Sequence, residues 1–380
     1  MSRRAGILFE NAYHWRPIPS SAFPKAMTAV LSLPRCLPLA AALLALLGLA
    51  ACSGERAPES DAGAPAAAAP ERLVIYTERK PNLLDPVLAA FTAETGIAVE
   101  TRTDSADALI ERLVAEGAGT PADVLITVDA GNLWQAAERG LFAPIVSPVL
   151  EANVPANLRD AEGRWFGLSE RARTIMYAEG RVDPAMLSTY EALAEPQWKG
   201  KLCLRSASKV YNQSLVAMMV ERLGPDRTLE VLRGWVANLA TAPFADDTLL
   251  LQAIAAGQCE VGIANTYYLG RLEKENPDFP VAPFWPNQAD AGVHVNISGA
   301  GVLAASQRKD TAKRFLEWMS GDTAQTLLAG LNFEYPVKPG LEVDPIVRGW
   351  GEFKADPGDI AVAGRRQAEA VMLMDRAGWR

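Results

Sequence analysis

The stretch Cys259–Pro277, CEVGIANTYYLGRLEKENP, decides the fold because it predicts a strand that runs directly into a helix. Val261 to Asn265 is short and apolar, which indicates a buried strand, and Leu269 to Glu275 is typical of a helix. Tyr267 and Tyr268 stand between the two elements. In open α/β sheets, such strand ends are where ligands bind. The stretch therefore raises the question of why two bulky phenols occupy this position.

The same alternation of strand and helix extends along the chain from residue 72 onward. Strand-to-helix units fill residues 72–139, and a second set fills residues 199–275. Long strands at 163–180 and 292–306 connect the two sets. This pattern predicts an α/β fold with mostly parallel sheets, helices on both faces and two crossover strands.

The two crossover strands predict two lobes joined by a hinge. The first lobe is expected to comprise residues 71–171 together with residues 302–380, which include the C-terminal helices. The second lobe is expected to comprise residues 172–301. A single long domain is the alternative, and the two separate sets of strands and helices argue against it.

The N-terminal part of the chain predicts export. The apolar run 37–51 follows Arg35 and is too short to span a bilayer, which takes about 20 residues. It ends in the sequence LAAC at Cys52, which resembles the lipobox of bacterial lipoproteins. We therefore expect residues 1–51 to be a leader and signal peptide, residues 52–70 to be a flexible tether, and the protein to be periplasmic and lipid-anchored at Cys52. An ordinary signal peptide followed by an unrelated cysteine is the alternative.

The net charge argues against nucleic acid as a partner. The chain has 380 residues and a formal charge of −8. Residues 1–51 hold five basic residues and one acidic residue, a net +4, so the remainder carries −12. Proteins that bind nucleic acid present an excess of positive charge instead.

The cysteines predict one disulfide bond. Of the four cysteines, Cys36 belongs to the leader and Cys52 to the lipid site, which leaves Cys203 and Cys259 as an even pair. An exported protein folds in an oxidising compartment, where such a pair is oxidised. We expect the two residues on neighbouring strands of the second lobe. Two buried free thiols are the alternative.

The loops that follow the predicted strands hold the candidate site residues. They are Thr77–Lys80, Val128–Gly131, Arg205–Tyr211 and Asn265–Tyr268. Three of the eight tyrosines of the chain lie in the last two loops. Helix N-termini also point their free N–H groups toward this edge of a sheet, which favours anions there.

A phenol becomes a metal ligand only when a cation displaces its proton. Its pKa is near 10, so it binds hard trivalent cations such as iron(III) as a phenolate. The chain has only two histidines, His14 and His294, and its cysteines and histidines do not show zinc spacing. From the residues alone, a packed tyrosine with a hydrogen-bonded hydroxyl remains the alternative.

Four stretches of the chain resemble the periplasmic iron(III)-binding proteins of ABC transporters, the ferric-binding protein family. They are PADVLITVDAGNLWQAAERGLF, VYNQSLVAMMVERLG, AIAAGQCEVGIANTYYLGRL and FWPNQADAGVHVNISGAGV, and the likeness covers residues 73–344. The resemblance implies a two-lobe periplasmic-binding-protein fold of type II. It also implies iron(III) as cargo, held by Tyr211, Tyr267 and Tyr268.

The first lobe departs from the family pattern. Many members follow the first strand with His-Tyr or Gln, whereas this chain has Lys80 and Pro81 there. A protein ligand from this loop is therefore in question. Arg79 and Lys80 lie beside a predicted helix N-terminus, so we expect them to hold a carbonate that completes the coordination of the iron. Arg173 in the crossover strand is expected to assist, and a structural salt bridge is the alternative for it.

Three functions compete. The first is iron(III) binding in a cleft between the lobes, followed by delivery to the permease and ATPase subunits of an ABC importer by a monomeric protein. The second keeps the fold but replaces the cargo with a small oxyanion or organic molecule such as a phosphonate, thiamine or a polyamine. The third, an enzyme that uses Asp129, lacks a nucleophile with its base, and Asp129 more simply caps a helix. We therefore expect a binding protein and not an enzyme.

Overall fold

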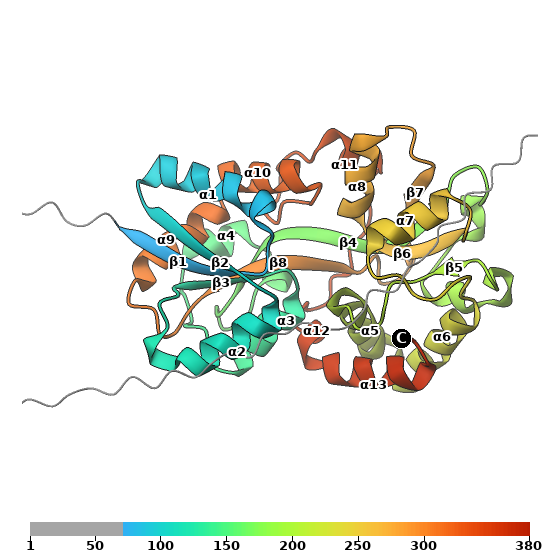
Figure 1. The fold of residues 1–380 in the computed structure, drawn as a ribbon, viewed down its shortest axis with the longest axis horizontal. Helices are drawn as coiled ribbons and strands as arrows, with labels where there is room; N and C mark the ends of the chain where they lie inside the picture. Colours follow the sequence, from blue (N-terminus) through green and yellow to red (C-terminus); the bar gives the residue numbers. More distant parts are fainter. Residues whose placement is uncertain (1–70) are drawn as a thin grey trace, which may run out of the picture. The chain divides into compact units, whose positions relative to one another are not determined.

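The structure is a computed structural model that describes residues 71–380 (Figure 1). The predicted leader and signal peptide (1–51), the lipid-bearing Cys52 and the predicted tether (52–70) lie outside the described residues. Within residues 71–380, no helix is both long enough and apolar enough to cross a membrane.

The first lobe begins with the predicted strand-to-helix units, which the structure confirms. Their elements are β1 (Arg72–Thr77), α1 (Pro81–Thr95), β2 (Ala98–Thr103), α2 (Ala106–Glu116), β3 (Val124–Thr127) and α3 (Ala130–Glu138), followed by α4 (Pro148–Asn153). Local signals set the helix ends. Helix α1 starts at a proline, whose missing N–H is harmless in the first turn, and it stops before Gly96, which has a φ of 73°. Ser105 caps α2 by accepting a hydrogen bond from the backbone N–H of Ala108.

The second lobe repeats this arrangement with a shorter first strand. Its elements are β5 (Leu202–Cys203), α5 (Val210–Leu223), α6 (Pro225–Ala237), α7 (Asp247–Ala255), β6 (Val261–Asn265), α8 (Thr266–Glu275) and β7 (Val281–Phe284). In both parts of the chain, short 3₁₀ helices occupy several connections. They are Gly117–Gly119 and Ala156–Leu158 before β4, and Pro184–Met186, Glu191–Ala194 and Pro196–Trp198 after it. The strand predicted in residues 199–209 is reduced to the two residues of β5, because the mostly polar residues 205–209 belong to the loop before α5.

Two long strands connect the lobes. They are β4 (Phe166–Ala178) and β8 (Val295–Val302), which run through the centre of Figure 1. The hydrogen-bonded strand order is β2-β1-β3-β8-β4-β6-β5, with β7 paired to β4. The strand order is continuous from one lobe to the other because β4 pairs with strands of both. Its residues up to Ala172 pair with β8, and those from Arg173 onward pair with β6 and β7.

The strand directions refine the prediction of mostly parallel sheets. Strand β1 is parallel to both β2 and β3, and β5 is parallel to β6. Each pair that includes β4 or β8 is antiparallel. The parallel prediction therefore holds for the strand-to-helix units, and the crossover strands make the sheet mixed.

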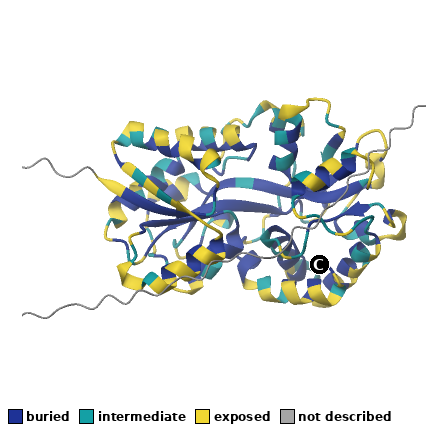
Figure 2. Cartoon of the chain, viewed as in Figure 1, coloured by how far each residue is buried: buried dark blue, intermediate teal, exposed yellow. Residues whose placement is uncertain are grey.

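Two separate hydrophobic cores underlie the two lobes. The first surrounds β1, β2 and β3 and includes Trp165, and the second surrounds β5 and β6 and includes Trp235. Buried residues continue along β4 and β8 between the two cores (Figure 2). The crossover strands are thus buried along nearly their whole length. The lobe boundaries at 171 and 301 remain predictions.

The segment after β8 divides between the two cores. Helices α9 (Lys309–Met319) and α10 (Asp322–Asn332) pack on the first core. After α11 (Pro345–Gly349), the short helix α12 (Val362–Arg365) packs against both α3 and α5. Helix α13 (Gln367–Ala377) packs on the second core through Leu373 and Met374. The C-terminal helix therefore lies with the second lobe, whereas the sequence led us to assign residues 302–380 to the first.

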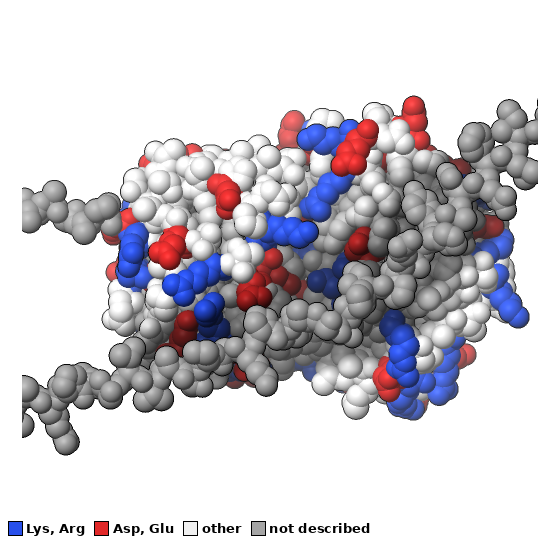
Figure 3. All heavy atoms as spheres, viewed as in Figure 1, with Lys and Arg blue, Asp and Glu red and all other residues white. Residues whose placement is uncertain are grey.

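Acidic and basic side chains are interspersed on the described part of the face drawn in Figure 3. This part of the surface does not present the continuous positive patch that binds nucleic acid. It agrees with the argument from net charge.

Candidate metal-binding site

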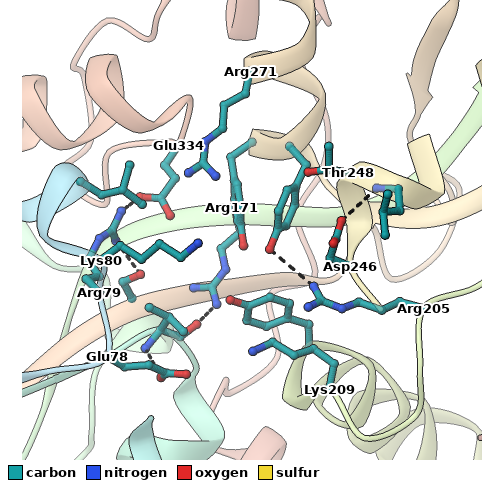
Figure 4. Close-up of a pocket in the computed structure, with 17 residues that line it drawn as sticks. Glu78, Arg79, Lys80, Arg171, Arg205, Lys209, Asp246, Thr248, Arg271 and Glu334 are labelled. Atoms are coloured by element: carbon teal, nitrogen blue, oxygen red, sulfur yellow. Dashed lines mark hydrogen bonds and ion pairs between the residues drawn. The ribbon is translucent and has the colours of Figure 1, made fainter. Parts of the chain in front are cut away.

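A cavity of about 580 Å³ lies between the two lobes, at the ends of the strands. Most of its lining side chains come from three places (Figure 4). The loop after β1 provides Glu78, Arg79 and Lys80; the crossover strands provide Arg171 and Ser298; and the second lobe provides Arg205, Lys209, Tyr211, Asp246, Tyr267, Tyr268 and Arg271. Glu334 reaches the cavity from the segment after α10. A volume of this size suits a small ligand or a chelated ion.

The three predicted tyrosines line this one cavity. Helix α8 begins at Thr266, three residues earlier than predicted, so Tyr267 and Tyr268 lie in its first turn. Their ring centroids are 4.4 Å apart with an interplanar angle of 33°. Tyr211 is the second residue of α5, which follows β5 after the loop 204–209, whereas α8 follows β6 directly. Two strand-to-helix junctions thus present three phenols to one space.

The phenols are partly hydrogen-bonded in the protein. Asn265, at the N-cap position of α8, donates from its side chain to the hydroxyl of Tyr267 at 3.3 Å. Arg205 donates to the hydroxyl of Tyr268 at 3.5 Å. Both donors stabilise negative charge on the oxygen that receives the bond.

Burial keeps two of the phenols protonated in the absence of a cation. It raises the pKa of Tyr267 well above the usual 10, and the charges of the Tyr211 and Tyr268 oxygens raise it further. Burial also raises the pKa of Tyr211, with Tyr268 raising it and Arg171 lowering it. These mutual effects show that the three oxygens are electrostatically coupled. A ligand that stabilises all three phenolates together must carry a high positive charge.

Positive side chains pack on the rings of the tyrosines. Over Tyr211, the Lys209 ammonium lies 4.7 Å from the ring centroid, and the guanidinium carbons of Arg171 and Arg205 lie at 5.4 Å and 5.7 Å. The guanidinium carbon of Arg271 lies 4.9 Å from the Tyr267 centroid and 5.7 Å from that of Tyr268. Such cations favour ionised phenols and also attract anions into the cavity.

The predicted anion-binding residues differ in their ion pairs within the described part of the chain. Arg79 and Lys80 both line the cavity, as expected. Arg79 already has partners, because it pairs with Glu334 at 2.6 Å and donates to Ser298 at 2.7 Å. Lys80 is exposed at the N-cap position of α1. Within residues 71–380, the Lys80 ammonium makes no ion pair, so its charge is available to a ligand.

Arg173 does not line the cavity, contrary to the expectation that it assists anion binding. Its guanidinium is buried, pairs with Asp247 at 2.9 Å and donates to Asn212 and Asn265. All of these contacts are structural, which agrees with the salt-bridge alternative. Arg171, two residues earlier in β4, lines the cavity in its place.

Several site residues were missed by the sequence reasoning. Arg171 donates one N–H to the backbone oxygen of Val128, and its Nη1 has no hydrogen-bond partner among the described residues. Arg271 follows Tyr267 by four residues, a helical spacing that places both on one side of α8. That spacing could have identified Arg271 as a site residue from the sequence. Glu334 follows Phe333, which has a φ of 55°, and no sequence pattern predicts that turn.

Two further expectations are confirmed near the site. Cys203 and Cys259 form a disulfide bond with a Cα–Cα distance of 6.0 Å. It connects β5 with a position two residues before β6, and these two strands lead to the tyrosine-bearing helices. Asp129 caps α3 by accepting a hydrogen bond from the backbone N–H of Gly131 at 2.8 Å. Among residues 71–380, His, Cys, Asp and Glu do not form a cluster of three or more that would bind a metal.

Comparisons with known proteins agree with this geometry. Residues 76–326 match the family model for bacterial extracellular solute-binding proteins. Iron uptake protein A1 of Synechocystis sp. is 44% identical over 316 residues, which cover 82% of this chain and 88% of that protein. The Fe(3+)-binding periplasmic protein of Serratia marcescens is 32% identical over 321 residues, which cover 83% and 93%.

Solved structures show the same fold. The Trichodesmium FutA (IdiA) structure in complex with iron and citrate superposes with a TM-score of 0.78 and 42% identity, covering 81% of this chain and 100% of that chain. The ferric binding protein from Campylobacter jejuni superposes with a TM-score of 0.77 and 34% identity, covering 81% and 100%. These similarities confirm the two-lobe periplasmic-binding-protein fold.

Proposed function

Because the chain belongs to the bacterial extracellular solute-binding protein family, we propose that it is the iron(III)-binding component of an ABC importer. The observation that carries the proposal is the convergence of Tyr211, Tyr267 and Tyr268 on one cavity between the lobes. The relatives are named for iron uptake and for binding of Fe(3+), which agrees with the resemblance seen in the sequence. They are transport proteins, so the expectation of a binding protein and not an enzyme is confirmed.

The three phenolates suit iron(III) in charge and in chemistry. Their three negative charges neutralise the ion, and hard oxygen ligands favour a hard cation. Release then follows from acid, which reprotonates phenolates, or from reduction to iron(II), which weakens a hard-oxygen site.

A carbonate completes the coordination of the iron in this proposal. Arg79 and Lys80 were the predicted anion ligands, but the charge of Arg79 is already matched by Glu334. Lys80 and the Nη1 of Arg171, which has no hydrogen-bond partner within residues 71–380, are therefore the donors best placed to hold the anion. A charge-assisted, bidentate arginine contact is well suited to a carbonate.

The competing cargo is a small oxyanion or organic cation. Six lysine and arginine side chains line the cavity against three carboxylates: Arg79, Lys80, Arg171, Arg205, Lys209 and Arg271 against Glu78, Asp246 and Glu334. This excess of positive charge disfavours thiamine or a polyamine. It leaves an oxyanion as the second candidate, bound either alone or together with the iron.

The proposed partners follow from the family. The loaded protein delivers iron to the permease and ATPase subunits of the importer. A lipid on Cys52 would keep the monomeric protein at a membrane surface in the periplasm, with residues 52–70 as its tether.

The test is a titration of the purified protein with iron(III) and bicarbonate. A phenolate-to-iron charge-transfer band is expected in the visible spectrum, together with a rise in melting temperature. The band should fade strongly in Tyr267→Phe and Tyr268→Phe. Tyr177→Phe is a matched control, because Tyr177 lies in β4 and does not line the cavity. A protein that stays colourless with iron but is stabilised by an oxyanion would favour the second candidate.

A further inference from the structure

Glu78 is a carboxylate that faces the cavity from the first lobe. It follows β1, and it lines the same cavity as Tyr211, Tyr267 and Tyr268 of the second lobe. Figure 4 shows it on the side of the cavity formed by the loop after β1, across from Arg205 and Thr248. The sequence alone does not decide whether this loop supplies a metal ligand, because Lys80 and Pro81 replace the usual residues.

The position of Glu78 is fixed by the surrounding backbone. Its own N–H donates to the carbonyl of Ile126 in β3 at 3.0 Å. Its Oε2 accepts hydrogen bonds from the backbone N–H of Val128 at 3.1 Å and from the side chain of Asn132 at 3.4 Å. Within residues 71–380, no hydrogen bond reaches Oε1. One oxygen of the carboxylate is therefore anchored, and the other is free to bind a ligand.

The other two carboxylates of the cavity are occupied differently. Glu334 is ion-paired with Arg79 at 2.6 Å. Asp246 belongs to the second lobe and caps α7 by accepting from the N–H of Leu249 at 2.9 Å. Glu78 makes no ion pair within residues 71–380, although six basic side chains line the same cavity.

We propose that Glu78 is the fourth protein ligand of the iron and the one contributed by the first lobe. The inference rests on the proposed iron-binding function and adds a residue to it. Three phenolates and one carboxylate oxygen occupy four of the six positions of an octahedral ion. The remaining two positions fit a bidentate carbonate. The added negative charge is offset by the basic side chains around the cavity, among them Lys80 and Arg171.

A ligand from the first lobe would couple iron binding to closure of the lobes. The tyrosines alone bind iron from one side, so without Glu78 the first lobe reaches the ion only indirectly, through the carbonate held by Lys80. A bond to Glu78 exists only when both lobes surround the ion. The ion then binds the closed form more tightly than the open form, and this difference shifts the population toward the closed form.

The competing role for Glu78 is structural, through its bond to the N–H of Val128. The variants Glu78→Gln and Glu78→Ala separate the two roles. Glutamine keeps an acceptor oxygen for Val128 but cannot be an anionic ligand, whereas alanine removes both functions. Asp246→Asn is the matched control, because it removes one negative charge from the same cavity and asparagine still caps a helix.

The experiment measures iron(III) binding with bicarbonate in the wild type and these variants, by the charge-transfer band and by small-angle scattering. For Glu78→Gln we expect iron affinity to fall at least about tenfold, since even indirect partners of metal ligands cost 10–100-fold. The band should move to longer wavelength, because the loss of an anionic ligand makes the iron a stronger acceptor. The decrease in radius of gyration on iron binding should become smaller. Asp246→Asn should weaken iron binding less than Glu78→Gln does, and it should leave the band position and the decrease in radius of gyration near those of the wild type.

Two outcomes would overturn the inference without affecting the proposed function. In the first, Glu78→Gln binds iron like the wild type with an unmoved band. In the second, Glu78→Gln and Asp246→Asn weaken binding equally with an unmoved band, which would mean that Glu78 acts only through its charge. A wild type that develops no band at all would instead reject the iron-binding function itself.

Discussion

Arg173 and Asp247 form a salt bridge of 2.9 Å in which the two side chains are only 1% and 0% exposed. Arg173 is the first residue of β4 that pairs with β6, and Asp247 begins α7. Asp247 also accepts a hydrogen bond from the backbone N–H of Asn265, the residue before α8. The pair therefore connects the crossover strand to the helix that carries Tyr267 and Tyr268.

Breaking this pair should destabilise the protein. Asp247→Ala leaves the guanidinium of Arg173 buried without its counter-charge, and such a loss costs about 3–5 kcal/mol. Denaturant unfolding of the metal-free protein measures the effect. Glu342→Gln is the control, because Glu342 pairs with Arg348 at 3.0 Å on the surface and such pairs contribute at most about 1 kcal/mol. Equal stabilities of the two variants would contradict the prediction.

The disulfide between Cys203 and Cys259 should stabilise the second lobe. It closes a loop with a sequence separation of 56 residues. For a loop of this length, the chain-entropy model gives a stabilisation of roughly 4 kcal/mol. The double variant Cys203→Ala and Cys259→Ala should unfold at correspondingly lower denaturant concentration.

The disulfide should also affect iron binding. It holds β5 and β6 in a fixed relation, and these strands precede the helices that carry Tyr211 and the Tyr267–Tyr268 pair. We therefore expect the folded double variant to bind iron more weakly than the wild type. A variant of unchanged stability and unchanged iron affinity would show that the bridge has neither role.

The place of the tyrosines at the strand ends could be predicted from the sequence, because it depends on the local pattern alone. A short apolar strand followed by a helix places the residues between them at the strand end, wherever the strand lies in the sheet. The helix start was misplaced. Helix α8 begins at Thr266, directly after Asn265 in the N-cap position, although the Asn265 side chain bonds to Arg173 and Tyr267 and not to a backbone N–H of the helix.

The choice between Arg171 and Arg173 could not be made from the sequence. They are two residues apart in β4, so strand alternation places both on one face. Strand β4 changes its partner from β8 to β6 between Ala172 and Arg173. Arg171 consequently faces the cavity, while Arg173 is enclosed by α5 and α7. Pairing of this kind is set by tertiary structure and leaves no trace in the local pattern.

Lys80 should set the bicarbonate requirement for iron binding. Its ammonium lines the cavity without an ion pair among the described residues, whereas Arg79 is neutralised by Glu334. Lys80→Ala should raise the bicarbonate concentration that gives half of the charge-transfer band. Lys309→Ala is the control, because Lys309 is exposed at the start of α9 and does not line this cavity. An equal bicarbonate requirement in both variants would show that Lys80 does not hold the anion.

The buried carboxylate of Asp129 should make the stability of the metal-free protein depend on pH. Asp129 is fully buried and accepts hydrogen bonds from Ser214 at 2.7 Å and Asn296 at 2.8 Å. Burial raises its pKa from 3.8 to about 6, although Arg171 and the hydrogen bonds from Ser214 and Gly131 lower it. The native state therefore binds this proton more tightly than the unfolded chain does.

The sign of the effect follows from linkage. Between pH 4 and pH 6 the native state holds a proton that the unfolded chain has released, so the free energy of unfolding falls as the pH rises. A shift of this size corresponds to roughly 3 kcal/mol between the two ends of the window. Asp129→Asn cannot titrate but still caps α3, so its stability should change less over the same range. Urea unfolding of both proteins from pH 4 to pH 7 measures the difference, and parallel pH profiles would show that Asp129 is not the titrating group.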